Sequence, residues 1–369
     1  MDWSSEQDAA LKAVSDWLKR PDQQVFRLFG YAGTGKTTLA RHVAEGTRGE
    51  VAFGAFTGKA ALVMRSKGCA GASTIHSLIY RPKRKSVEED EEEESFSFAI
   101  NRESAASKAS LIVIDECSMV DEELGKDLLS FGKKTLVLGD PAQLPPVKGG
   151  GFFTEAEPDV MLTQVHRQAA DNPIVRMSMD IREGRSLDYG TYGESRVIRR
   201  KDINAESILS AGQTLVGMNR TRKLYNNRIR ELRGYTAAYP EVGEKLVCLR
   251  NDKSKSLQNG GIFRVTKVKA PKSGLLKMDV APDDIIDRAR IAVSVLPAFF
   301  EASDAEIPYL LRRKSDEFDY GYALTVHKAQ GSQWDEVVLF DESGAFREHR
   351  QRWLYTGVTR AAEKLTIVM

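Results

Sequence analysis

Cysteine is scarce in this chain, with three residues among 369. Cys69, Cys117 and Cys248 are scattered along the sequence and lack the spacing of metal ligands. Small secreted proteins, by contrast, use closely spaced cysteines as disulfide frameworks. We therefore expect a reduced, intracellular protein without a zinc site.

Long apolar runs and an excess of one charge are also missing. No run approaches the roughly 20 apolar residues that span a bilayer, and residues 1–6 lack the basic start and apolar core of a signal peptide. We therefore expect no membrane partner. The 54 basic and 52 acidic residues give a net charge of +2, so any nucleic-acid site must be a local groove. The length indicates two or three domains.

One short motif is highly informative. Residues 30–37 read G-Y-A-G-T-G-K-T, the phosphate-binding loop pattern, between an apolar run at 25–29 and a helical stretch at 38–44. The glycines let backbone N–H groups turn toward a polyphosphate, and the helix N-terminus favours negative charge. We expect Lys36 to reach the β- and γ-phosphates and the Thr37 hydroxyl to bind Mg²⁺.

Two further strand ends carry side chains suited to phosphate chemistry. The apolar run 111–114 ends in Asp115 and Glu116. We expect Asp115 to hold Mg²⁺ through water and Glu116 to orient or deprotonate the attacking water. The run 135–138 leads into a proline-stiffened loop with Gln143. For Gln143 the residues alone leave two interpretations open, a γ-phosphate sensor or a structural turn.

The rest of the chain shows how the domains are organised. The first 150 residues alternate strand-like and helical runs, the βαβ rhythm of a mostly parallel sheet. Residues 81–107 interrupt it with a basic cluster and seven consecutive acids at 88–94, typical of a solvated loop whose flanks are able to form a hairpin. A second α/β region begins near Thr214. Short strands and glycine turns between 239 and 319 indicate an inserted β-barrel.

The order of motifs resembles that of superfamily 1 helicases over nearly the whole chain, specifically the 1B branch of RecD-like and Dda-like helicases. The matching segments are 4–7 (Q motif), 30–37 (motif I), 55–61 (motif Ia), 73–76 (a Thr-x-His element), 114–119 (motif II), 139–146 (motif III), 162–168 (motif IV), 322–332 (motif V) and 353–361 (motif VI). So many motifs in one order are specific together, although several are weak alone.

The resemblance implies an α/β fold of two RecA-like P-loop NTPase domains. The first would span 1–155, with a small hairpin insert, the pin, at 81–107. The second would comprise 156–238 and 320–369, around an SH3-like β-barrel insert at 239–319. The implied cofactors are ATP and Mg²⁺.

The resemblance also implies a role for individual residues, with Gln7 reading the base and with Arg167 and Arg360 acting on the γ-phosphate. The expected catalytic residues are Lys36, Glu116, Gln143, Arg167 and Arg360. The expected nucleotide-binding residues are Gln7, Gly30, Ala32, Gly33, Thr34, Gly35, Lys36, Thr37, Thr38 and Asp115, with Thr37 and Asp115 at the metal. The expected DNA-binding residues are Thr57, Lys59, Thr74, His76, Thr325, His327, Lys328, Ser332, Phe96 and Phe98.

Two features keep alternative interpretations. The helical stretch 219–233 is rich in arginine and is either a solvated face or part of a DNA path. Phe96 and Phe98 in the pin, and Phe299 and Phe300 in the barrel, are either core residues or a wedge against bases.

The expected function is 5′–3′ translocation on single-stranded DNA and unwinding of tailed duplex DNA, with the polarity implied by the resemblance alone. One alternative is a translocase that displaces proteins without separating strands, because the pin segment is acidic. Another is a nucleotide-switched nucleic-acid binding module. An RNA track also stays open. We expect a functional monomer in the cytoplasm of a bacterial or phage-infected cell, working with replication or recombination proteins.

Overall fold

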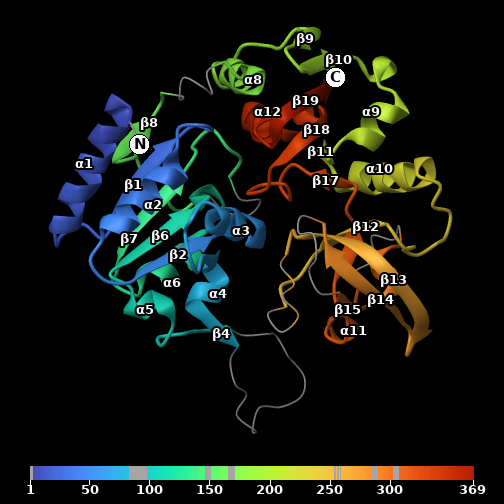
Figure 1. Ribbon diagram of the computed structural model, residues 1–369, viewed down its shortest axis with the longest axis horizontal. Helices are drawn as coiled ribbons and strands as arrows, with labels where there is room; N and C mark the ends of the chain where they lie inside the picture. Colours follow the sequence, from blue (N-terminus) through green and yellow to red (C-terminus); the bar gives the residue numbers. More distant parts are fainter. Residues whose placement is uncertain are drawn as a thin grey trace. The chain divides into compact units, whose positions relative to one another are not determined.

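The protein is described by a computed structural model that divides into two compact units, residues 1–171 and 172–369 (Figure 1). The described residues are 3–82, 98–145, 151–164, 171–252, 255, 257, 259–283, 290–301 and 307–369. Each unit has its own six-stranded sheet.

The first unit is built on a parallel sheet with the order β3-β2-β6-β7-β1-β8. Its strands are β1 (Val25–Gly30), β2 (Val51–Ala55), β3 (Ser73–Thr74), β6 (Leu111–Asp115), β7 (Lys134–Gly139) and β8 (Val160–Leu162). Alternate residues of β6 face opposite sides: Leu111 and Val113 join one apolar core, and Ile112 and Ile114 join the other. The sheet is therefore buried on both faces.

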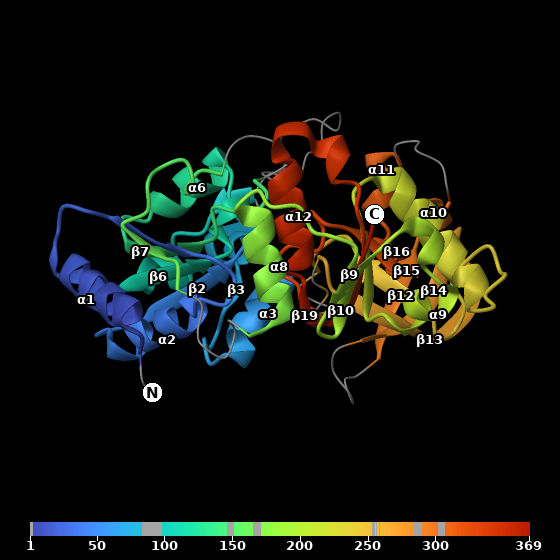
Figure 2. The same cartoon turned by 90° about the horizontal axis from the view of Figure 1, so that it is seen from above.

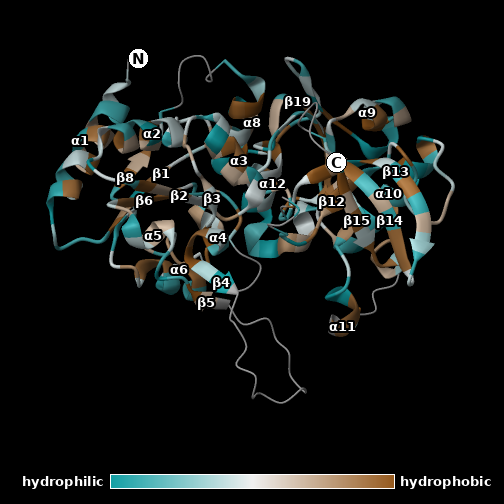
Figure 3. Ribbon diagram, turned by 60° about the horizontal axis from the view of Figure 1, so that its bottom comes forward, coloured by the Kyte–Doolittle hydropathy of each residue, from teal (hydrophilic) through white to brown (hydrophobic). Residues whose placement is uncertain are grey.

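Helices cover both faces of this sheet. They are α1 (Ser5–Lys19), α2 (Lys36–Gly46), α3 (Gly58–Ser66), α4 (Ile75–Ile79), α5 (Ala105–Lys108), η1 (Cys117–Met119) and α6 (Glu122–Leu129). Helix α1 begins with a capping box in which Ser4 and Gln7 each bind the other's backbone N–H. Its buried side chains recur at helical spacing, and Figure 3 accordingly shows polar and apolar stretches side by side on α1.

The end of the first unit differs from the sequence-based expectation, and the segment 81–107 is described only in part. The unit extends beyond residue 155, where we placed the domain end, because β8 pairs with β1 and so belongs to the first sheet. In the segment 81–107, β4 (Tyr80–Pro82) pairs antiparallel with β5 (Phe98–Ile100). The acidic run 88–94 lies outside the described residues.

The second unit has a six-stranded sheet in the order β17-β11-β18-β19-β10-β9, parallel except for the β9–β10 pair. Its strands are β9 (Gly190–Tyr192), β10 (Ser195–Ile198), β11 (Gln213–Val216), β17 (Ala323–Thr325), β18 (Trp334–Phe340) and β19 (Ala361–Val368). Its helices are α8 (Pro173–Arg182), η2 (Arg200–Asp202), α9 (Ala205–Ser210), α10 (Asn219–Leu232), η4 (Ser343–His349) and α12 (Arg350–Val358).

A second, antiparallel sheet is inserted between α10 and β17, where both views draw it beside α10 (Figures 1 and 2). Its strands are β12 (Lys245–Cys248), β13 (Ile262–Lys272), β14 (Leu275–Pro282), β15 (Ile291–Val295) and β16 (Phe318–Tyr320), in the order β15-β14-β13-β12-β16, with η3 (Pro297–Phe299) and α11 (Tyr309–Arg312) in its connections. A bridge between Val295 and Asp316 joins its two edges, as in a small barrel.

Within the part of the chain that the structure describes, every helix is too short or too polar to cross a bilayer.

Candidate functional site

The predicted nucleotide residues of the first unit gather at one edge of its sheet. The carboxyl end of β1 leads into the loop 30–37, that of β6 into Asp115 and Glu116, and that of β7 into the loop with Gln143. The strands β6, β7 and β1 are neighbours in the sheet, so these ends lie side by side. The carboxyl edge of a parallel sheet is where such folds bind ligands.

The loop 30–37 has the backbone that a phosphate cradle needs. Gly33 and Gly35 have φ of 81° and 85°, a left-handed backbone conformation that residues other than glycine rarely adopt. A Cβ on Gly30 would lie 2.7 Å from both Leu162 and Thr34. The Lys36 ammonium lies over the loop and donates to the carbonyl oxygens of Gly30 at 2.6 Å and Tyr31 at 3.0 Å. The lysine that is predicted to bind phosphate is therefore held at the loop by backbone carbonyl oxygens.

The predicted metal pair is in contact. The Thr37 hydroxyl donates to a carboxylate oxygen of Asp115 at 2.9 Å, although the two are far apart in sequence. Mg²⁺ prefers such hard oxygen donors and takes most of its other ligands from water and phosphate. Elsewhere in the described residues no cluster of three or more acidic, histidine or cysteine side chains is suited to a metal. The donor set fits Mg²⁺ held jointly with a nucleotide.

The two groups expected to handle water have unusual local structure. Glu116 has φ 54° and ψ 44°, uncommon for a residue with a side chain, and its N–H donates to Asp115 at 2.8 Å. The Gln143 side chain is 7% exposed, and its Oε1 has no hydrogen-bond partner among the described residues. A buried, unsatisfied amide oxygen in a structural turn is costly, which favours the functional interpretation of Gln143.

Gln7 and Thr34 support the loop directly. Gln7 is 2% exposed, and its amide donates to the Thr34 carbonyl at 3.0 Å. The Thr34 hydroxyl, in turn, donates to the Tyr31 carbonyl at 2.9 Å. A base contact by Gln7 stays a prediction.

Glu6 is a site residue that sequence reasoning missed. Its carboxylate accepts from the N–H and hydroxyl of Thr163 and from the N–H of Gln164, at 2.8 to 3.0 Å. These contacts anchor the start of the motif IV segment that carries Arg167. The sequence shows only an acidic side chain in the first turn of α1, which by itself indicates a favourable helix N-terminus and no contact with residues 163–164. Arg167 itself lies outside the described residues.

The DNA-binding candidates of the first unit lie at the ends of β2 and β3. Thr57 and Thr74 are the N-caps of α3 and α4, and their hydroxyls accept from Ala60 and Ser77. Lys59 lies in the first turn of α3, and the exposed His76 in that of α4, with its ring 6.3 Å from Phe56. Phe96 lies outside the described residues, and Phe98 lies in β5.

The candidates of the second unit lie at the end of β17 and in the residues after it. Thr325 is 6% exposed and accepts from the Lys328 N–H at 3.3 Å, and Ser332 is 4% exposed. The His327 ring lies 5.5 Å from Phe346. Desolvation lowers the pKa of the Lys328 ammonium, and the nearby Arg222 lowers it further.

Arg360 is buried within the second unit. It is 5% exposed and donates to the carbonyls of Thr356 at 3.0 Å and Ser332 at 3.2 Å, and to the Thr359 hydroxyl at 3.1 Å. Its expected role at the γ-phosphate stays a prediction.

The imidazoles of His76 and His327 should be neutral at physiological pH. Desolvation lowers the pKa of both from the usual 6.5; Asp121 opposes this at His76, and His349 adds to it at His327. Because the folded-state pKa values lie below the unfolded value, stability from these groups is present above about pH 6.5 and is lost as the pH falls. NMR titration of the ring protons should give midpoints below those of a histidine peptide, and higher midpoints would contradict this.

Two families of known proteins match this chain. Residues 3–202 match the AAA domain family, and residues 320–368 match the UvrD-like helicase C-terminal domain. The chain is 28% identical over 91% of its length to the ATP-dependent RecD2 DNA helicase of Deinococcus radiodurans, of which it covers 46%. It is 24% identical over 99% of its length to the ATP-dependent DNA helicase Pif1 of Bdellovibrio bacteriovorus, of which it covers 87%.

A solved structure shows the same fold. The crystal structure of Pif1 helicase from Bacteroides in complex with ADP-AlF3 and ssDNA matches with a TM-score of 0.56 and 18% identity, over 99% of this chain and 92% of that chain. This likeness confirms the expected pair of RecA-like domains. The chain spans less than half the length of several curated relatives that it matches. By its match over residues 3–202, the chain belongs to the AAA domain family, and its motif order resembles that of superfamily 1B helicases of the RecD-like and Dda-like branch.

Proposed function

We propose that the protein hydrolyses ATP at the loop 30–37 and uses it to move 5′ to 3′ on single-stranded DNA and to unwind tailed duplexes. The observation that carries the proposal is the contact between Thr37 and Asp115 at the mouth of this loop. It brings motifs I and II together as Mg²⁺-dependent phosphoryl transfer requires.

The ATP site would divide the chemistry among the predicted residues. Lys36 and the loop backbone bind phosphate oxygens, and Thr37 with Asp115 would hold Mg²⁺, which when bound neutralises phosphate charge. Glu116 would take a proton from the attacking water, and Gln143 would position that water. Arg167 and Arg360 would stabilise the charge that develops on the γ-phosphate.

The DNA contacts would come from both units. The N-cap positions of Thr57 and Thr74 present backbone N–H groups that suit a DNA phosphate. Neutral His76 and His327 would stack on bases, while Lys328 supplies charge. The ssDNA bound to the Bacteroides relative supports single-stranded DNA as the track. We assign the β4–β5 hairpin as the pin and the inserted barrel as the SH3-like domain.

The test is ATP-dependent unwinding of two duplexes, one with a 5′ and one with a 3′ single-stranded tail. We expect the 5′-tailed substrate to be unwound at least about tenfold faster, since motors of one polarity load on one tail. Faster unwinding from the 3′ tail would contradict the proposed polarity. Intact DNA-stimulated ATPase without unwinding would favour the translocase, and DNA binding without turnover would favour the nucleotide switch.

A further inference from the structure

Helix α10 carries a buried polar stripe, which we define as Arg222, Asn226 and Arg230. These residues are spaced by four and are 5%, 2% and 8% exposed, so they lie on one face of the helix. The basic helix expected from the sequence therefore has two of its arginines inside the unit, where a polar group needs a partner. All three partners lie at or next to the junction of the inserted barrel.

Asn226 completes the open edge of β17. Its amide donates to the Ala323 carbonyl at 3.2 Å, and its Oδ1 accepts from the Ala323 N–H at 2.8 Å. The strand β17 is the last in its sheet and pairs with β11 on the other side. The carboxamide therefore takes the place of a neighbouring strand at the first residue of β17.

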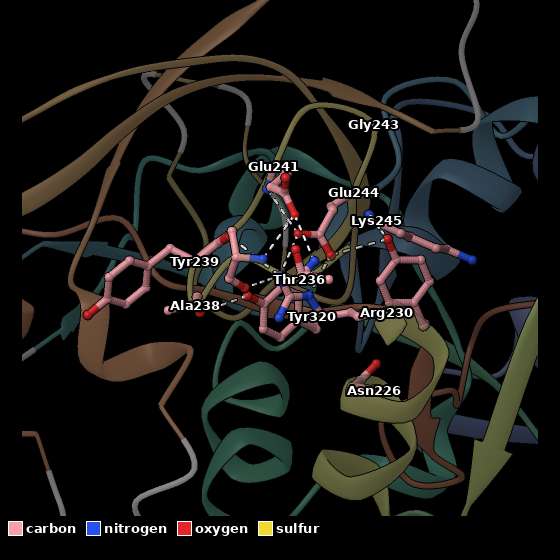
Figure 4. Close-up of polar contacts among 12 residues, drawn as sticks. Asn226, Arg230, Thr236, Ala238, Tyr239, Glu241, Gly243, Glu244, Lys245 and Tyr320 are labelled. Carbon is pink, nitrogen blue, oxygen red and sulfur yellow. Dashed lines mark hydrogen bonds and ion pairs between the residues drawn. The ribbon is translucent and has the colours of Figure 1, made fainter. Parts of the chain in front are cut away.

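The two arginines hold the chain just before β17. Arg222 forms an ion pair with Asp319 at 2.6 Å, and both side chains are largely buried. Arg230 contacts both carboxylate oxygens of the fully buried Glu244, at 2.6 and 2.9 Å, and lies 4.2 Å from the centre of the Tyr320 ring (Figure 4). The same guanidinium donates to the Ala237 carbonyl. The stripe thus contacts both chain segments that connect the barrel to the second unit, the one before β12 and the one before β17.

The gripped segment runs without a break into motif V. Strand β16 is joined through Gly321 and Tyr322 to β17, and Lys328 follows three residues after β17 ends. At Gly321 a Cβ would lie 2.8 Å from the backbone of Leu246, so the chain has no room to shift toward β12 there. The segment is confined by β12 on one side and by α10 on the other.

We propose that the polar stripe of α10 is a set of positioning residues that holds the motif V segment, residues 323–328, in the conformation that contacts single-stranded DNA. This rests on the proposed function, because the DNA contacts of Thr325, His327 and Lys328 belong to it. Loss of the grip on Ala323 raises the DNA concentration that half-maximal ATPase stimulation requires. It leaves ATP hydrolysis without DNA as in the wild type, since no stripe residue belongs to the ATP site.

The discriminating variant is Asn226→Asp, with Asn227→Asp as the matched control on the exposed neighbouring position. In N226D the ionised carboxylate keeps the acceptor for the Ala323 N–H and loses the donor to its carbonyl. At pH 8 we expect N226D to need about tenfold more DNA than the wild type, the effect of losing one buried hydrogen bond. N227D should stay within about twofold of the wild type.

A reduced melting temperature with an unchanged DNA requirement would show a merely structural stripe and overturn the proposal. Amide hydrogen exchange of the free protein tests the positioning role without any measurement of ATPase activity. In N226D at pH 8, relative to the wild type, amides 323–328 should exchange about tenfold faster and those of α2 at an unchanged rate. If the wild type lacks DNA-stimulated ATPase, the proposed function fails, and unchanged exchange at 323–328 separately refutes the positioning role.

Discussion

Replacement of Lys36 by alanine should lower DNA-stimulated ATP hydrolysis at least about a hundredfold and leave single-stranded DNA binding within a few-fold of the wild type. Lys36 is the loop's ammonium group, placed at the mouth of the cradle by the carbonyls of Gly30 and Tyr31. Removing one preorganised donor from a phosphoryl-transfer site typically costs two to three orders of magnitude in rate. The DNA-binding candidates lie at other strand ends, so their contacts persist.

The measurement pairs steady-state ATPase with fluorescence anisotropy on a labelled oligonucleotide. Lys12→Ala is a suitable control, because Lys12 is an exposed lysine on α1. Substantial residual turnover in the Lys36 variant would place hydrolysis elsewhere. Joint loss of ATPase and DNA binding would indicate a folding defect, to be checked by the melting temperature.

Replacement of Arg230 by alanine should destabilise the second unit by about 3–5 kcal/mol. The variant leaves the carboxylate of Glu244, which is 0% exposed, without its bidentate partner. A buried charge that loses its partner keeps the cost of desolvation and loses the compensating attraction. The cation–π contact with Tyr320 is lost as well.

Urea titration of three variants would check this expectation. Arg228→Ala, on the exposed face of the same helix and paired with Glu231 at the surface, should change stability by less than about 1 kcal/mol. The double variant Arg230→Met, Glu244→Leu removes both charges and should recover most of the loss, since an apolar pair replaces a buried ion pair at little cost. Equal effects of Arg230→Ala and Arg228→Ala would show that the buried pair contributes little.

The arrangement of side chains at the candidate nucleotide site was largely predictable, because it depends on short stretches of sequence. A glycine-rich loop after an apolar strand, and acids at a strand end, place their side chains at one sheet edge by topology alone. The Thr37–Asp115 contact follows from that rule. The AAA domain match over residues 3–202 supports the same architecture around the loop, and phosphate binding by the loop stays a prediction.

The long-range polar contacts were not predictable in the same way. Glu6 reaches Thr163, and Arg222 reaches Asp319, because the tertiary fold brings them together. The sequence of α10 shows that the helix is basic, but it does not show which of its arginines are buried. The short β8 belongs to the first sheet by pairing rather than by composition, so the first unit extends past residue 155.

The junction of the barrel also bears on how such chains diversify. Strands β12 and β16 pair with each other, so Leu246 and Tyr320 lie opposite one another where the inserted segment leaves and rejoins the second unit. Two chain ends this close can be bridged by a short turn without moving α10 or β17. We therefore expect the host sheet to tolerate exchange of everything beyond that pair, so that barrels of different size and surface could be acquired or lost here during evolution while the strands of the host sheet keep their register.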